Sequence, residues 1–231
     1  MATKLNKRTA ANLKLVPENP LEPADAIAAV KKFKGPKFDQ SVEVCMHLGV
    51  DVRQADQMLR GSVSLPKGIG KSKTVIAFCG DDVVKDALAA GAVKAGGAQL
   101  AEEIEKGWMD FEVAIASPDM MRVISKLGRV LGPKGLMPSP KNGTVTPKVV
   151  DAVQEFAAGK VEYRTDKGGN IHGIIGKMSF TEADLLENYN HFVETIEKIR
   201  PSSVKGVYVK KITVSGTMTP GVQVKLAAVE A

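Results

Sequence analysis

The sequence predicts an α/β protein with two domains, one of which is discontinuous in the chain. Three observations predict this fold class. Strand and helix patterns alternate between residues 74 and 158, which is typical of a layered βαβ unit. A β-β-α-β-β pattern of antiparallel character follows residue 160. One clear strand, at residues 41–48, stands alone before residue 70. We therefore expect an α+β two-layer domain from residues 1–68 and 161–231, with a three-layer βαβ domain inserted at 69–160.

The first part of the chain contains the strand without a local partner. Residues 1–14 are basic and predict either a helix lying on the surface or a partly disordered segment. Residues 25–33 predict a short helix that ends at Gly35-Pro36. In residues 41–48 apolar and polar side chains alternate, which indicates a half-buried strand. Its backbone groups need hydrogen-bond partners from elsewhere in the chain.

The middle of the chain has the pattern of a parallel sheet covered by helices. The apolar run at 74–79, bounded by Gly80, is typical of a strand buried on both faces. Thr146-Pro147 predicts the start of a helix, with threonine as the N-cap and proline in the first turn. The expected helices are 81–90, 98–106, 118–127 and 146–158, and the second expected strand is 111–116.

The last part of the chain supplies partners for the lone strand. Residues 161–165 and 170–175 flank a glycine-containing turn and predict a hairpin. Thr181 and Asp184 have capping-box spacing at the start of a helix expected to reach residue 199. Strands are expected at 206–214 and 222–228, around a turn at 216–221. Two linkers, near residues 68 and 160, then join the domains and permit a hinge.

Composition and charge favour an anionic partner and give no sign of a metal site or a membrane anchor. The 231 residues carry a formal net charge of +6, and 44% of them are apolar. A basic excess of this kind favours nucleic acid as a partner. Cys45 and Cys79 lack CxxC spacing, the histidines are scattered, and no metal or cofactor is expected. Without a signal-peptide pattern or a membrane-length apolar run, we expect a cytoplasmic protein with no membrane partner.

The stretch GRVLGPKGLMPSPKNG, at residues 128–143, interrupts the regular patterns. Its glycines and prolines argue against helix or central strand, and no acid occurs between Met120 and Val150. Its basic residues are Arg129, Lys134 and Lys141. Two interpretations stay open on these grounds, a backbone arranged to meet an anion and a solvated loop whose charges provide solubility.

Enzymatic motifs are weak or misplaced. Gly70-Lys71-Ser72 matches the end of a phosphate-binding P-loop, but the upstream glycine is replaced by Leu65 and the segment precedes its strand. Because no catalytic constellation is visible, we expect a protein that is not an enzyme. A phosphate-handling enzyme and a DNA-binding protein are the rival hypotheses. Phe38 and Met218 fit either contact with ribose and bases or ordinary packing within the protein.

Several motifs together resemble one known family. The 128–143 stretch closely resembles the signature of the universal large-subunit ribosomal protein one family, in its bacterial form. The similarity runs nearly end to end. It includes Lys37-Phe-Asp-Gln-Ser-Val-Glu43, Gly169-Asn-Ile-His172, Ile175-Gly-Lys177 and Ser215-Gly-Thr-Met218. The turn departs from the commoner family pattern at Gly216 and Thr219.

The resemblance implies a fold, partners and site residues. Family members have a discontinuous domain that binds ribosomal RNA and a Rossmann-like insertion. They lie in the mobile stalk beside the exit site, contact the departing transfer RNA (tRNA), and in bacteria can repress their own messenger RNA (mRNA). By this similarity the ribosomal RNA contacts would be Lys37, Phe38, Ser41, Glu43, Thr217 and Met218, with His172 and Lys177 as weaker candidates. Arg129, Lys134 and Lys141 would face tRNA or the interdomain region.

Overall fold

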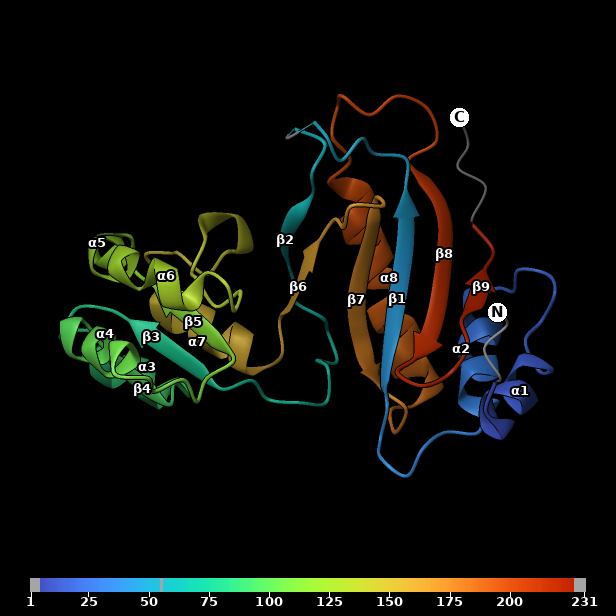
Figure 1. Cartoon of the computed structure of the whole chain (residues 1–231), viewed down its shortest axis with the longest axis horizontal. Coiled ribbons are helices and arrows are strands. Elements are labelled where there is room, and N and C mark those ends of the chain that lie inside the picture. Colours follow the sequence, from blue (N-terminus) through green and yellow to red (C-terminus); the bar gives the residue numbers. More distant parts are fainter. Residues whose placement is uncertain (1–4, 55, 227–231) are drawn as a thin grey trace. The chain divides into compact units, whose positions relative to one another are not determined.

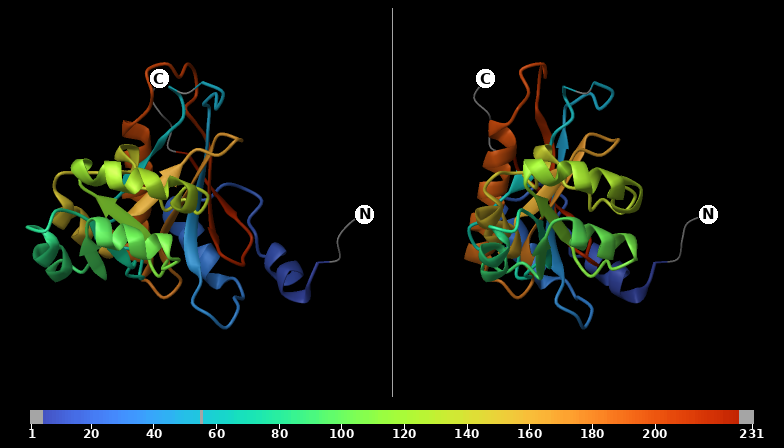
Figure 2. Two further views of the ribbon diagram at one scale, coloured as in Figure 1. Left: turned by 60° about the vertical axis from the view of Figure 1, so that its left-hand side comes forward. Right: turned by 90° about the vertical axis from the view of Figure 1, so that its left-hand side faces the viewer.

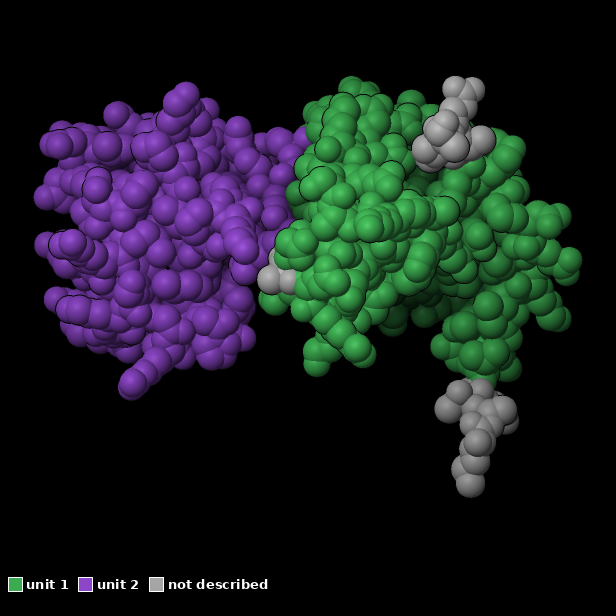
Figure 3. All heavy atoms as spheres, turned by 90° about the horizontal axis from the view of Figure 1, so that it is seen from above, with its two compact units in different colours: residues 1–59, 65–70, 163–231 green, residues 60–64, 71–162 purple. Residues whose placement is uncertain are grey.

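The computed structural model describes residues 5–54 and 56–226, which form two compact units (Figure 1). Figure 3 colours them separately. Unit 1 contains Met1–Leu59, Leu65–Gly70 and Tyr163–Ala231, and unit 2 contains Arg60–Ser64 and Lys71–Glu162. Unit 1 is therefore discontinuous. The domain limits predicted from the sequence, 1–68 with 161–231 and 69–160, stay a prediction.

Unit 1 is built around an antiparallel sheet with strand order β7-β1-β8-β9. Helices α2 and α8 pack on one face of this sheet (Figure 1). Its elements are α1 (Lys7–Leu13), α2 (Pro23–Lys32), β1 (Ser41–Leu48), β7 (Asn170–Lys177), α8 (Glu182–Lys198), β8 (Val209–Gly216) and β9 (Val222–Val224).

The lone strand predicted at 41–48 is confirmed as the centre of this sheet. β1 pairs with β7 on one side and with β8 on the other, so both of its partners come from after residue 160. Along β1, buried residues alternate with half-buried ones, and Val44 and Met46 are fully buried under the helices. The polar residues of β1 lie on the opposite face, which no helix of unit 1 covers in the described part of the chain (Figure 1).

Helix α8 is fixed by its predicted cap and by close packing on β7. Thr181 Oγ1 accepts a hydrogen bond from the Asp184 backbone N–H at 3.1 Å, as the capping-box spacing predicts. Gly173 in β7 lets the ring of Phe192 approach the strand, because a Cβ there would lie 2.4 Å from a ring carbon. This contact holds the helix layer against the sheet.

Unit 2 is a parallel sheet with strand order β4-β3-β5 and helices on both faces (Figures 1 and 2). Helices α3 and α7 pack on one face, and α4, α5 and α6 pack on the other. The mixed α/β fold class is confirmed. The elements are β2 (Arg60–Val63), β3 (Val75–Phe78), α3 (Val84–Ala89), β4 (Lys94–Gly96), α4 (Ala98–Glu105), β5 (Val113–Ala116), α5 (Met121–Ile124), α6 (Gly128–Leu131) and α7 (Val149–Ala157), with short 3-10 turns at Pro118–Met120, Ser125–Leu127 and Pro140–Asn142.

Several boundaries differ from the prediction. Helix α7 begins at Val149 with Lys148 as its N-cap, so Thr146 and Pro147 precede the helix rather than start it. The last strand ends at Val224; positions 227 and 228, also predicted as strand, lie outside the described residues. Two short strands were not predicted. One is β4, and the other is β2, which pairs with β6 (Val161–Arg164) in a two-stranded sheet.

Two buried tyrosines predict how unit 1 responds to alkaline pH. Burial raises the pKa of Tyr189 and of Tyr208 to about 12, from an ordinary value of 10.0. The folded state therefore holds these protons more tightly than the unfolded chain does. Their contribution to the free energy of unfolding is complete below pH 10 and is lost as the pH rises toward 12. Tyrosinate absorbance, which measures this, should show Tyr189 and Tyr208 ionising only near that pH. Ionisation of both near pH 10 in the folded protein would contradict the prediction.

Candidate nucleic-acid interface

Three strand ends meet at one edge of the unit 1 sheet. β1 begins at Ser41, opposite Lys177 at the end of β7, and Val42 lies opposite Gly216 at the end of β8. Thr217 and Met218 follow β8 directly. The fold therefore gathers residues that lie far apart in the sequence. We call this place the Ser41 edge: Gln40, Ser41, Lys177, Thr217 and Met218, together with Lys37 and Phe38 in the segment that leads into β1.

Hydrogen bonds to Ser41 join the strands at this edge. The Thr217 backbone N–H donates to the Ser41 carbonyl at 3.0 Å. The Ser41 N–H in turn donates to Thr217 Oγ1 at 3.2 Å. Lys177 Nζ donates to Ser41 Oγ at 3.0 Å, which places an ammonium group beside the two hydroxyls. The edge thus presents a cation and two hydroxyls, the groups that bind phosphate and sugar oxygens.

Gln40 positions the turn that carries Met218. Its side chain is only 4% exposed, and its Oε1 accepts from the Met218 N–H at 2.8 Å. The Gln40 carbonyl accepts from the Met178 N–H, also at 2.8 Å. Thr219 Oγ1 closes the same turn by accepting from the Gly216 N–H at 2.8 Å. Gly216 and Thr219, the two residues that depart from the commoner family pattern, therefore bond to each other.

Two large apolar side chains are exposed at the Ser41 edge. Phe38 is 54% exposed and Met218 is 52% exposed. The interpretation of Phe38 as a packed core residue is therefore wrong, since the preceding Lys37 and the following Asp39 are exposed too. An exposed aromatic ring beside lysines can stack on a base or pack on a ribose.

Glu43 and His172 lie on the open face of the sheet, farther from the Ser41 edge. Glu43 is opposite Ser215 on β8 and Ile174 on β7. His172 is opposite Cys45, and its Nε2 lies 3.6 Å from Asp166 Oδ2. Hydrogen bonds from Asn170 lower the pKa of Asp166 to about 2, so this partner is a carboxylate at neutral pH. The structure does not bring His172 to the hydroxyls of Ser41 and Thr217.

In unit 2, the 128–143 stretch is more regular than its composition predicts. Residues 128–131 form helix α6, because Leu127 and Leu131 are buried and anchor it to the core. The expectation that this segment contains no helix is therefore wrong. The stretch remains basic, with exposed side chains at Arg129, Lys134 and Lys141.

Asn142 fastens this stretch to β2. The buried Asn142 accepts from Arg60 Nε at its Oδ1, at 2.6 Å, and its carbonyl accepts from Ser62 Oγ at 2.9 Å. Asn142 Nδ2 also donates to Glu162 Oε2 at 2.6 Å. Sequence reasoning missed this residue because an asparagine before a glycine has the pattern of an ordinary turn.

The carboxyl ends of two parallel strands in unit 2 are followed by acidic residues. Ligands of open parallel sheets lie beyond the carboxyl ends of the strands. Here Asp81 and Asp82 follow β3, and Asp119 follows β5. Gly70-Lys71-Ser72 precedes β3, at the opposite end of that strand. These carboxylates would repel a phosphate group, so the arrangement disfavours a phosphate-handling site.

Two chemical possibilities for the described residues are a metal site and a reactive thiol. Within residues 5–54 and 56–226, no group of three or more His, Cys, Asp or Glu side chains is placed to hold a metal ion. Burial is the main cause that raises the pKa of both thiols, the buried Cys79 and the half-buried Cys45. Both thiols are therefore poor nucleophiles at neutral pH.

Comparison with known families decides the assignment. The model of the ribosomal protein L1p/L10e family matches residues 30–220. The chain belongs to this family. It is accordingly a protein of the large ribosomal subunit that binds ribosomal RNA and takes part in translation, and it is not an enzyme. The resemblance carried by the 128–143 stretch is thereby confirmed, as are the ribosomal RNA and the large subunit as partners. Among the helices of the described residues, none has the length and apolarity needed to cross a membrane.

Proposed function

We propose that this L1p/L10e family member binds the stalk region of large-subunit ribosomal RNA through the Ser41 edge and the adjoining open face of unit 1. One observation carries this proposal: Ser41, Lys177 and Thr217 are hydrogen-bonded together next to exposed Phe38 and Met218. The proposed ribosomal RNA contacts are Lys37, Phe38, Ser41, Glu43, His172, Lys177, Thr217 and Met218.

Each group has a chemical role in this proposal. Lys37 and Lys177 neutralise phosphates, while the hydroxyls of Ser41 and Thr217 exchange hydrogen bonds with phosphate or sugar oxygens. Phe38 and Met218 pack on bases or riboses. The Glu43 carboxylate accepts from a ribose 2′-hydroxyl or a base amine, which favours RNA over DNA. Binding should weaken with salt, by roughly a thousandfold between 50 and 200 mM if six phosphates are contacted.

The finer parts of the proposal rest on the sequence resemblance. We propose that the protein acts in the cytoplasm, on the ribosome, and assists the movement and release of exit-site tRNA. The exposed Arg129, Lys134 and Lys141 of unit 2 are the proposed tRNA contacts. We further propose that the protein represses translation of its own mRNA through the ribosomal RNA surface, and that residues 1–68 with 161–231 act as the RNA-binding domain, with 69–160 as the insertion.

Substitutions at the Ser41 edge test the ribosomal RNA interface. Thr217→Ala and Met218→Ala should each weaken binding to a stalk ribosomal RNA fragment by about tenfold, since each removes interactions worth about 1–1.5 kcal/mol. Lys148→Ala, an exposed lysine of unit 2, is the control and should change the dissociation constant by less than about twofold. Gel-shift titrations measure all three. Equal effects of the three substitutions would contradict the assignment.

A further inference from the structure

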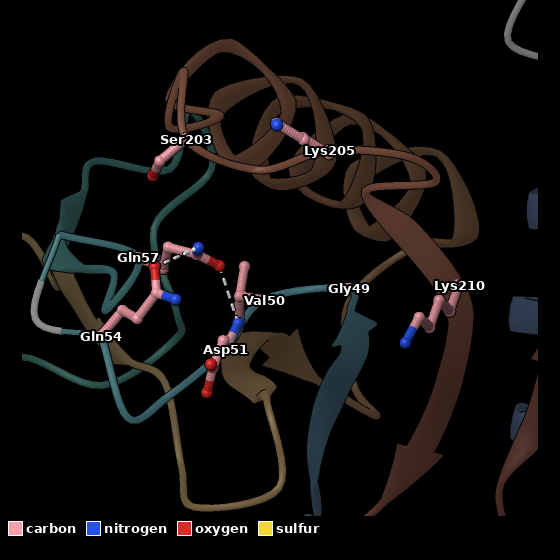
Figure 4. Close-up of a pocket in the computed structure, with 8 residues that line it drawn as sticks. All are labelled: Gly49, Val50, Asp51, Gln54, Gln57, Ser203, Lys205 and Lys210. Atoms are coloured by element: carbon pink, nitrogen blue, oxygen red, sulfur yellow. Dashed lines mark hydrogen bonds between the residues drawn. The ribbon is translucent and has the colours of Figure 1, made fainter.

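A hollow lies at the end of β1 opposite the Ser41 edge. It measures about 680 Å³ and lies where β1 ends and β8 begins (Figure 4). Because β1 has eight residues, with a rise of about 3.3 Å each, this hollow is roughly 26 Å from the Ser41 edge. It is lined by Gly49, Val50, Asp51, Gln54, Gln57, Ser203, Lys205 and Lys210.

A β-bulge directs Lys210 to this hollow. His47 pairs with Lys211 and Leu48 pairs with Val209, so Lys210 is the extra residue between the two pairs. Strict alternation would bury one of the two lysines, whereas both are exposed here. Bulges of this kind often redirect a side chain toward a binding site. The stem of Lys210 passes over Gly49, where a Cβ would lie 3.2 Å from Lys210 Cε.

The opposite wall of the hollow presents a hydrogen-bond donor. Buried Gln57 accepts from the Asp51 N–H through Oε1 at 2.8 Å and donates through Nε2 to Gln54 Oε1 at 2.8 Å. This bond occupies the oxygen of the Gln54 amide, so its NH₂ group faces the hollow, as Figure 4 shows. The Asp51 carboxylate accepts from the Arg53 N–H at 3.0 Å and points away from the lysines.

The hollow therefore has the chemistry of an anion site. Neither Lys205 nor Lys210 forms an ion pair with any described residue, whereas six other lysines and His172 do. Both lysines, the Ser203 hydroxyl and the Gln54 amide line the hollow (Figure 4). Val207, on the adjoining loop, is 70% exposed and offers an apolar surface beside these donors.

We propose that this hollow binds a backbone phosphate of the ribosomal RNA whose main contact is the Ser41 edge. The inference rests on the proposed interface of unit 1 and extends it along β1. Lys205, Lys210, Ser203 and the Gln54 amide hold the phosphate oxygens, and Val207 packs on the neighbouring ribose. The RNA then lies along the open face of the sheet and is held at both ends.

The double variant Lys205→Gln, Lys210→Gln tests this second contact in the full chain. Its affinity for a long stalk ribosomal RNA fragment should fall about tenfold. The slope of log affinity against log salt should become shallower by about one, because roughly one phosphate contact is lost. A shorter fragment serves as the comparison: it is trimmed until it is the shortest RNA whose binding is still weakened by Thr217→Ala. Because it reaches the Ser41 edge but not the hollow, it should bind the double variant and the wild type equally. The matched control Lys32→Gln, Lys198→Gln removes the same charge from the helix side of unit 1.

Each outcome separates the hollow from the main interface. If the wild type does not bind the long fragment in a Thr217-dependent way, the proposed interface fails. If the wild type binds the long fragment but the Lys205, Lys210 variant and the Lys32, Lys198 control weaken that binding equally, the hollow is not a specific site. Inorganic phosphate is the probe for a free-anion site. If phosphate binds the wild type but not the Lys205→Gln, Lys210→Gln variant, while RNA affinity stays unchanged in that variant, the RNA assignment is overturned.

Discussion

Asn188→Leu should destabilise unit 1 by about 3 kcal/mol, because it leaves three backbone groups without their partner. Asn188 lies on α8 and is 0% exposed. Its Nδ2 donates to the Ile175 carbonyl at 2.7 Å and to the Gly68 carbonyl at 3.0 Å. Its Oδ1 accepts from the Lys67 N–H at 3.1 Å. One side chain thus ties segment 65–70 to the helix and to β7. Leucine has a similar volume and makes none of these bonds.

The aromatic residues allow this effect to be assigned to unit 1. All three tyrosines, Tyr163, Tyr189 and Tyr208, belong to unit 1, whereas the one tryptophan, Trp108, belongs to unit 2. Urea unfolding followed by near-UV tyrosine circular dichroism should show the midpoint moving to lower urea. The control Asn190→Leu places the same substitution at an exposed position of α8 and should change stability by less than about 0.5 kcal/mol. A tyrosine transition that shifts equally in both variants would refute the role of Asn188.

Long, regular patterns in the sequence predicted much of the fold. The alternation at 41–48 and the cap at Thr181 were predicted because each depends on residues next to one another in the chain. Strands β2 and β4 were missed because they have only four and three residues and contain glycine. Helix α6 was missed because the burial of Leu127 and Leu131 outweighs the unfavourable helix propensity of nearby glycines and prolines.

The candidate sites depend on contacts across long stretches of chain, which a single sequence does not display. Ser41 and Thr217 are 176 residues apart and meet only because β1 pairs with β8. Their shared site came from family resemblance. Gln40 belongs to the same resembling motif, but nothing in the sequence indicated that it is buried or that it holds the turn. The bulge at Lys210 likewise follows from the register of β8 against β1. Sequence patterns therefore predict elements better than they predict the polar residues that hold two elements together.

Gln40→Met should weaken binding to the stalk ribosomal RNA fragment about tenfold, as much as removal of the Met218 side chain, because the turn loses the acceptor that fixes Met218. Methionine fills a similar volume but leaves the Met218 N–H without the oxygen that holds it at 2.8 Å. The turn then loses the bond that fixes Met218 relative to β1. Since Gln40 is only 4% exposed, its effect on RNA binding acts through the placement of Met218. It is a positioning residue.

The measurement must separate misplacement of the turn from loss of folding. Filter-binding titrations give the RNA dissociation constant, and tyrosine-monitored urea unfolding of the same variant gives the stability of unit 1. Gln154→Met, an exposed position on α7 of unit 2, is the matched control and should leave both quantities unchanged. We expect the affinity loss to exceed the stability loss, because the backbone bonds between Thr217 and Ser41 persist in the variant. RNA affinity within twofold of the wild type would show that the position of Met218 does not govern binding, and the Ser41 edge would then act through its hydroxyls, its lysines and Phe38.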